Sequence, residues 1–112
     1  MKVKNLLEST DFFLISDNSG IENEVNGIYS CDLLSHVMGF ASEKNILITV
    51  LNNINVLGVA SLLDLSCVIF SHKIQVNEAI IIKSNELNIP LIGTKLTTSE
   101  TVISLYNLGV PN

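Results

Sequence analysis

Hydrophobic residues are most concentrated in the middle of the chain, at residues 45–65. Residues 46–50 carry no charge, which is typical of a strand that is covered on both faces of a sheet. A polar turn at Asn52 and Asn53 follows. The helix predicted to begin at Ile54 is apolar almost all round, so we expect it to be covered on several sides. A strand, a short turn and a buried helix form half of a βαβ unit, which makes this segment the centre of the predicted fold.

Shorter apolar runs and helical patterns alternate along the rest of the chain. The predicted strands span residues 12–16, 24–30, 46–50, 66–70 and 90–93. The other predicted helices span residues 2–9, 32–41, 77–88 and 97–107. The helix at 77–88 is ambiguous, because its AIIIK run is also typical of a strand, but Asn77 is a good helix cap and the alternation favours a helix.

This alternation predicts a three-layer α/β/α fold, in which helices cover both faces of a mostly parallel, mixed sheet of four or five short strands. We expect the first two strands to pair antiparallel, because only the turn at residues 17–20 and the next few residues join them. On the last helix we expect Val102, Ile103, Leu105 and Tyr106 to be buried. The small residues around Gly58 suit close packing against the sheet or a second subunit. Residues 1–112 are expected to form a single domain.

The charge of the chain excludes some partners. Eleven acidic residues outnumber six lysines, there is no arginine, and the net charge is -5. Because nucleic-acid binding depends on clustered Lys and Arg, we expect no nucleic-acid partner. No apolar run reaches the ~18 residues that span a bilayer, and no signal peptide is recognisable, so we expect a cytoplasmic protein without a membrane partner. Cys31 and Cys67 stand in apolar surroundings and are expected to be buried and reduced.

Polar residues follow each predicted strand. If the strands are parallel, the loops after them lie at one edge of the sheet, where open α/β sheets bind ligands. The candidate ligand-binding residues are Asp32, Asn52, Asn53, Asn55, Thr94 and Lys95. The alternative is that such residues only cap helices and solvate loops, and Asp32 is predicted to be the N-cap of the helix at 32–41.

Sequence signals of catalysis are absent. There is no phosphate loop, no GxGxxG and no GxSxG. Asp32 and Asp64 lie at opposite ends of their predicted helices and do not form an acid–base pair. The sequence therefore predicts no enzyme, no catalytic residue, no metal site and no cofactor.

Three runs of sequence resemble the DRTGG domain family: GIYSCDLLSHVMGFA, ILITVLNNINVLGVASLLDL and NIPLIGTKLTTSETVISLY. Residues 32–34 match the family's Asp-Leu-Leu run, and Asn55 also matches. Asn52 and Asn53 stand where the family has a Thr-His pair, and the Asp-Arg-Thr-Gly-Gly string is absent. The resemblance is to small standalone members. It implies a fold similar to the N-terminal domain of HPr kinase/phosphorylase, an α/β/α structure that commonly dimerises, and a regulatory role.

Together these observations lead us to expect a non-catalytic regulatory or ligand-sensing module that forms a homodimer and binds a nucleotide or another small metabolite. The alternative function is a structural protein-interaction domain that partners a separate enzyme or signalling protein.

Overall fold

Five strands form one sheet in the computed structural model, which describes residues 1–112. They are β1 (Phe13–Leu14), β2 (Ile28–Ser30), β3 (Ile46–Thr49), β4 (Cys67–Phe70) and β5 (Leu91–Gly93). Their order across the sheet is β1-β5-β4-β3-β2. The pairs β2/β3, β3/β4 and β4/β5 are parallel, and β1 pairs antiparallel with β5. The sheet is therefore mostly parallel and mixed, as predicted.

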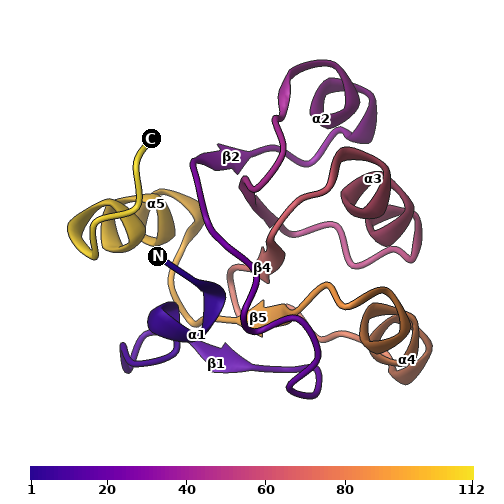
Figure 1. Cartoon of the computed structure of the whole chain (residues 1–112), viewed down its shortest axis with the longest axis horizontal. Helices are drawn as coiled ribbons and strands as arrows, with labels where there is room; N and C mark the ends of the chain where they lie inside the picture. Colours follow the sequence, from indigo (N-terminus) through magenta and orange to yellow (C-terminus); the bar gives the residue numbers. More distant parts are fainter.

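Helices cover both faces of this sheet. They are α1 (Val3–Leu6), α2 (Leu34–Phe40), α3 (Asn55–Leu63), α4 (Glu78–Leu87) and α5 (Thr98–Asn107). Figure 1 shows α2, α3 and α4 on one face and α1 with α5 on the other. From β2 to β5, each strand is followed in the chain by its neighbour on the same side in the sheet. Because the crossover connections are right-handed, the three connecting helices, α2, α3 and α4, lie on the same face. Because α5 follows the last of these strands and crosses the other face, the predicted three-layer α/β/α fold is confirmed.

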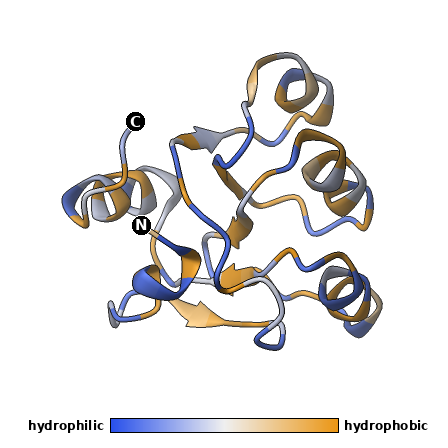
Figure 2. Ribbon diagram, viewed as in Figure 1, coloured by the Kyte–Doolittle hydropathy of each residue, from blue (hydrophilic) through white to orange (hydrophobic).

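The central strands β3 and β4 are buried at every position. Their side chains alternate between two hydrophobic cores, one on each side of the sheet. Ile46 and Ile48 pack in the core beneath α1 and α5, whereas Leu47 packs in the core beneath α2, α3 and α4. Figure 2 shows β4 and β5 as hydrophobic segments between these layers. Coverage on both faces explains why the sequence of β3 carries no charge.

Two helices are bounded by the local signals that the sequence contains. The side chain of Asn77 accepts a hydrogen bond from the backbone N–H of Ile80 at 3.0 Å, and α4 ends at Asn88, which adopts the left-handed conformation. Thr97 and Glu100 form a capping box at the start of α5. The hydrogen bonds from Thr97 lower the pKa of the Glu100 carboxyl. The ambiguous segment is therefore a helix, as the alternation favoured.

The first strand pairs differently from our prediction. We expected β1 and β2 to be antiparallel neighbours, but they lie at opposite edges of the sheet. Instead, Phe13 pairs with Gly93 and Leu14 pairs with Ile92. The physical reason is that β5 has every residue buried, so its outer edge must be paired and covered, and β1 provides that cover.

The outer surfaces of the helices are more apolar than predicted. On α5, Thr101 and Leu105 face the core, while Ile103 and Tyr106 are 60% and 63% exposed, contrary to our prediction. The central helix α3 packs against the sheet, α2 and α4, as predicted, but its outer side is exposed. A Cβ added to Gly58 would meet no atom within 4 Å, so this glycine does not pack against the sheet. None of the five helices combines the length and the apolar character that a membrane-spanning helix needs.

The two cysteines differ in their environment. Cys67 on β4 is fully buried, and burial raises the pKa of its thiol to about 12. Cys31 is only half-buried, and neither cysteine forms a disulfide. The prediction of burial is therefore confirmed for Cys67 and wrong for Cys31.

Replacing Gly20 with alanine should destabilise the fold by roughly 2 kcal/mol or more. Gly20 has a φ of +85°, and an added Cβ would collide with the carbonyl oxygen of Asn88. Chemical denaturation measures the loss. The matched control is Gly39→Ala on α2, where an added Cβ meets nothing within 4 Å and stability should stay level or rise by up to about 1 kcal/mol. Equal losses for both alanines would show that the close approach at Gly20 does not require glycine.

Candidate functional site at the carboxyl edge of the sheet

The carboxyl ends of β2, β3, β4 and β5 lie along one edge of the sheet, as their parallel register requires. Thr49 at the end of β3 pairs with Phe70 at the end of β4, and Phe70 pairs with Gly93 at the end of β5. The loops at residues 31–33, 50–54, 71–77 and 94–97 therefore begin side by side. The six candidate residues all belong to these loops or, in the case of Asn55, to the first position of α3.

Asp32 does not cap α2, contrary to our prediction. The N-cap of α2 is Leu33, which makes no side-chain cap hydrogen bond. The Asp32 carboxylate points instead to the end of β3, where its Oδ1 accepts hydrogen bonds from the Thr49 hydroxyl and the Val50 backbone N–H, both at 2.8 Å. Val50 lies just beyond the strand, so its N–H needs a partner there, and the neighbouring β2 loop supplies the carboxylate. Asp32 thus joins the ends of β2 and β3.

The asparagine turn before α3 also forms hydrogen bonds within the chain. Asn53 Oδ1 accepts from the backbone N–H of Asn55 at 2.9 Å, which turns the chain into α3. Asn52 Nδ2 donates to the carbonyl oxygen of Gln75 at 2.8 Å and so fixes the loop at 71–77. The Asn55 side chain is exposed and forms no hydrogen bond, which leaves its amide free at this edge.

A hydrogen-bonded group that we had not proposed as a site lies where α5 begins. The backbone N–H of Thr98 donates to His72 Nε2 at 3.2 Å, and the Thr98 hydroxyl lies 3.3 Å from the same nitrogen. The Ser71 hydroxyl lies 3.1 Å from the Thr98 hydroxyl. These contacts connect the end of β4 to the first turn of α5. The sequence contained no signal for them beyond the polar residues after the strand, because His72 and Thr98 are adjacent only in the fold.

The ends of β4 and β5 carry the remaining candidates. The backbone N–H of Lys73 donates to the carbonyl oxygen of Thr94 at 3.0 Å, which places the two loops side by side. The Thr94 side chain is buried, and its hydroxyl accepts from the backbone N–H of Leu96 at 3.2 Å. A cleft of about 300 Å³ opens here. Its lining residues are Phe13, Ile15, Lys73, Ile74, Gln75, Val76, Gly93, Thr94 and Lys95.

The structure therefore separates the six candidates into groups. Thr94 and Lys95 line one cleft. Asn52 adjoins it through the hydrogen bond to Gln75, which also lines the cleft. Asp32 and Asn53 use their oxygen atoms in the hydrogen bonds of the fold, whereas the exposed Asn55 side chain forms none. Lys73 also lines the cleft, although we did not include it among the six.

Replacing Asp32 with alanine should destabilise the fold by roughly 1–3 kcal/mol, because the Thr49 hydroxyl and the Val50 N–H would lose their common acceptor. Asp32→Asn retains one side-chain oxygen and should cost less. Urea denaturation at neutral pH compares the two variants with the parent chain. A loss from Asp32→Asn as large as that from Asp32→Ala would mean that the charge of Asp32, not its hydrogen-bonding oxygen, stabilises this edge.

Comparisons with known proteins agree with the fold. No family model matches the sequence, and a search of curated proteins finds no significant match. Among solved structures, the chain is similar to the CBS and DRTGG domains of the regulatory region of Clostridium perfringens pyrophosphatase, a structure complexed with the activator diadenosine tetraphosphate. The TM-score is 0.75 and the sequence identity is 19%. The match covers 98% of this chain and 47% of that chain, so this chain spans about half the length of its structural neighbour. At this identity the likeness establishes the fold alone, and that fold is DRTGG-like.

Proposed function

We propose that this chain is a non-catalytic regulatory module of the DRTGG type, which forms a homodimer and binds a nucleotide or another small metabolite at the carboxyl edge of its sheet. The observation that carries the proposal is the fold shared with a regulatory region whose structure contains a nucleotide activator. The candidate ligand contacts are Asp32, the turn at residues 52–55, Thr94 and Lys95.

The arrangement of the polar groups supports a non-catalytic role. The nearest approach to a catalytic pair is the Thr98 hydroxyl beside His72, at 3.3 Å. In catalytic triads a carboxylate or an amide accepts a hydrogen bond from the second ring nitrogen of the histidine and orients its ring. No carboxylate is hydrogen-bonded to His72, and the nearby Glu100 accepts the backbone N–H of Thr97 at 2.9 Å instead. The pair therefore serves to attach the start of α5 to the sheet.

A nucleotide or metabolite that binds should raise the melting temperature of the chain. A ligand at about a hundred times its dissociation constant adds roughly 2.7 kcal/mol to stability by linkage, which corresponds to a rise of several degrees for a domain of this size. A thermal-shift screen of nucleotides and small metabolites measures this rise. The combined variant Asn53→Ala, Asn55→Ala and Lys95→Ala should lose the ligand-dependent rise. The rise of each protein is measured relative to the same protein without ligand.

Lys4→Ala is the control, because Lys4 pairs with Glu22 away from this edge, and its ligand-dependent rise should equal that of the parent chain. A rise that persists in the combined variant would place the ligand elsewhere. A screen in which no compound shifts the melting temperature would contradict the ligand-sensing function itself.

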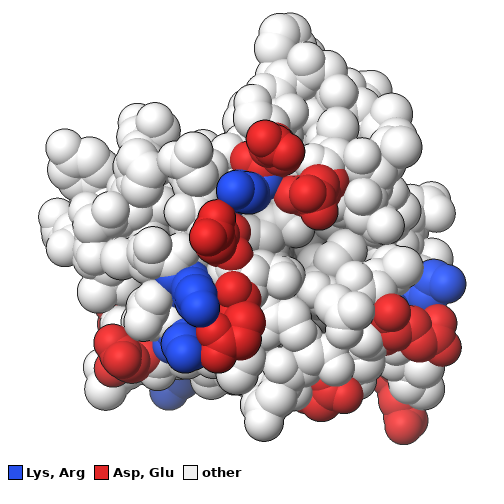
Figure 3. Space-filling model, viewed as in Figure 1, with Lys and Arg blue, Asp and Glu red and all other residues white.

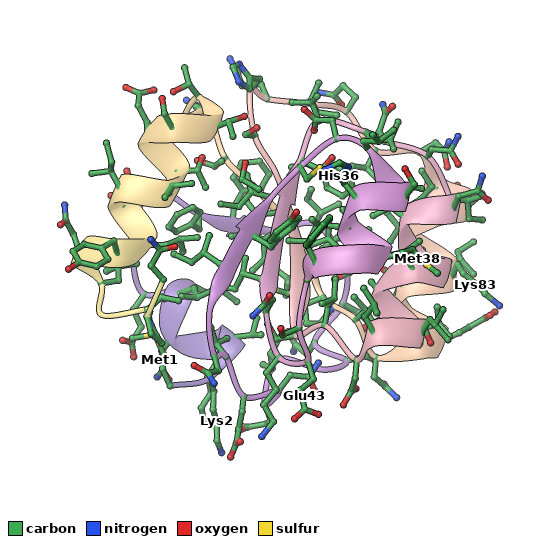
Figure 4. The ribbon with its side chains drawn as sticks, turned by 90° about the horizontal axis from the view of Figure 1, so that it is seen from above. Met1, Lys2, His36, Met38, Glu43 and Lys83 are labelled. Carbon is green, nitrogen blue, oxygen red and sulfur yellow. The ribbon has the colours of Figure 1, made fainter.

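The outer surface of the α2–α3–α4 layer supports the homodimer. A groove of about 610 Å³ lies over α3, and hydrophobic residues such as Ile54 and Leu62 line it. Leu62 on α3 and Phe40 on α2 are 69% and 67% exposed. Figure 4 shows Met38 on α2 and Lys83 on α4, which also line the groove. Contiguous apolar surface of this kind usually marks an interface, and a two-fold dimer is the commonest way to cover it.

Light scattering at micromolar concentration should give about twice the chain mass of 12.2 kDa. Leu62→Glu should convert the dimer to a monomer, since it introduces a charge into the apolar surface. The control is Ile103→Glu on α5, which lies in the opposite layer and is also exposed. This variant should remain a dimer. A monomeric parent chain would contradict the homodimer and would favour the alternative function, in which the same apolar surface binds a separate enzyme or signalling protein.

A further inference from the structure

Four of the six lysines form ion pairs with glutamates. Lys2 and Lys4 both pair with Glu22, at 3.0 and 2.9 Å. Lys44 pairs with Glu24 at 3.0 Å, and Lys83 pairs with Glu86 at 3.6 Å. Figure 3 shows blue and red side chains in contact on the face it presents. Lys73 and Lys95 form no ion pair, so they are the two cationic side chains whose charge is not neutralised within the chain.

Both unpaired lysines line the same cleft at the carboxyl edge. The chain has eleven acidic residues, yet none of them lines this cleft. Two lysines therefore line one concave site in a protein whose net charge is -5. Concave sites with a few converging polar groups are the usual form of small-molecule sites, and a volume of about 300 Å³ is at the lower end of their range.

The backbone holds the two lysines in place. The N–H of Lys73 donates to the carbonyl oxygen of Thr94, the residue before Lys95, at 3.0 Å. The N–H of His72 donates to the carbonyl oxygen of Leu96 at 2.8 Å. His72 and Lys73 have φ values of 60° and 57°, a left-handed backbone conformation that residues other than glycine rarely adopt. The fold thus maintains an unfavourable backbone conformation at the position that presents Lys73.

An aromatic ring forms part of the same cleft. Phe13 on β1 is 52% exposed, although it lies within the sheet. Its ring covers Gly93, its partner in β5, and any Cβ at that position would collide with the ring. Since the glycine provides the space that the ring occupies, the Phe13 ring lies against the end of β5. A half-exposed aromatic ring of this kind can stack on a planar ligand ring.

We propose that this cleft binds a small phosphorylated ligand with a planar ring, of which a nucleoside monophosphate is the simplest example. The ammonium groups of Lys73 and Lys95 hold the phosphate, and the Phe13 ring stacks on the base. The absence of acidic residues from the lining removes repulsion of the phosphate. This inference rests on the proposed function and deepens it, because it names the groups that recognise the ligand and restricts its size to about one nucleotide.

Titration of the ¹⁵N-labelled full chain with AMP, inorganic phosphate and adenosine tests the proposal by NMR. AMP should shift the amide signals of Phe13, Lys73, Thr94 and Lys95. Lys73→Gln/Lys95→Gln should weaken AMP binding by at least about tenfold, because both charge-assisted contacts are lost. Lys2→Gln/Lys4→Gln changes the net charge equally at a distant ion-paired site and should leave AMP binding unchanged. Phe13→Leu should weaken the binding of AMP but not that of phosphate.

Dispersed amide spectra of the unliganded variants show that they are folded, and the single variant Lys95→Gln replaces the double variant if Lys73→Gln disturbs the loop. Equal loss of AMP binding in the two double variants would overturn the proposal that AMP binds in this cleft, because the loss would then reflect net charge alone. AMP shifts confined to Asp32 and residues 52–55 would overturn the cleft but leave the proposed ligand-sensing function standing. No response to AMP, phosphate or adenosine would also overturn it, while a hit of different chemistry in the thermal-shift screen would still support the function.

Discussion

Because β3 and β4 are buried on both faces, every other element is placed around them. Each residue of these strands is inaccessible to solvent, so the sheet needs a helical layer on each side. Right-handed crossovers place α2, α3 and α4 on one face. The second face is then covered by the ends of the chain, where Val3 and Leu6 of α1 and Leu105 of α5 complete the core. The parallel arrangement that follows brings four loops to one edge.

The hydrogen bonds at that edge show which groups the fold itself needs. Asp32 connects β2 to β3, Asn52 connects the turn before α3 to the next loop, and His72 connects β4 to α5. No buried side-chain nitrogen or oxygen lacks a partner. Some of the polar residues that the sequence suggests as a binding site therefore stabilise the fold. What remains available to a ligand is the set of groups without an internal partner, chiefly Lys73 and Lys95.

The cleft and the apolar outer surface share one element. The loop at residues 71–77 lines the cleft and leads directly into α4, whose Lys83 and Leu87 line the groove over α3. The antiparallel strand β1 contributes the other wall of the cleft through Phe13. In the function that we propose, the ligand site and the partner surface are both built on the loop and helix that join β4 to β5.

Features that depend on neighbouring residues could be predicted from the amino-acid sequence. The caps at Asn77 and Thr97 and the end of α4 at Asn88 depend on contacts within a few residues. The uncharged run of β3 identifies a strand that is buried on both faces, whichever elements cover it. The alternation of these elements was enough to predict the α/β/α layers. The carboxyl edge as a candidate site, with Thr94 and Lys95 in it, followed from the parallel strands.

Which distant residues meet could not be predicted from the sequence, because it depends on how the elements pack against one another. β1 pairs with the outer edge of β5, and this pairing brings Phe13 to Gly93. The role of Asp32 depends on an N–H left free at the end of a neighbouring strand. Which residues of α3 and α5 are buried depends on how each helix is rotated against the sheet. Several sets of apolar positions satisfy a helical pattern equally well, so the sequence does not fix this rotation. Lys73 and Lys95 line one cleft because β4 and β5 are adjacent. Strand order depends on the packing of the whole chain, and local sequence patterns do not encode it.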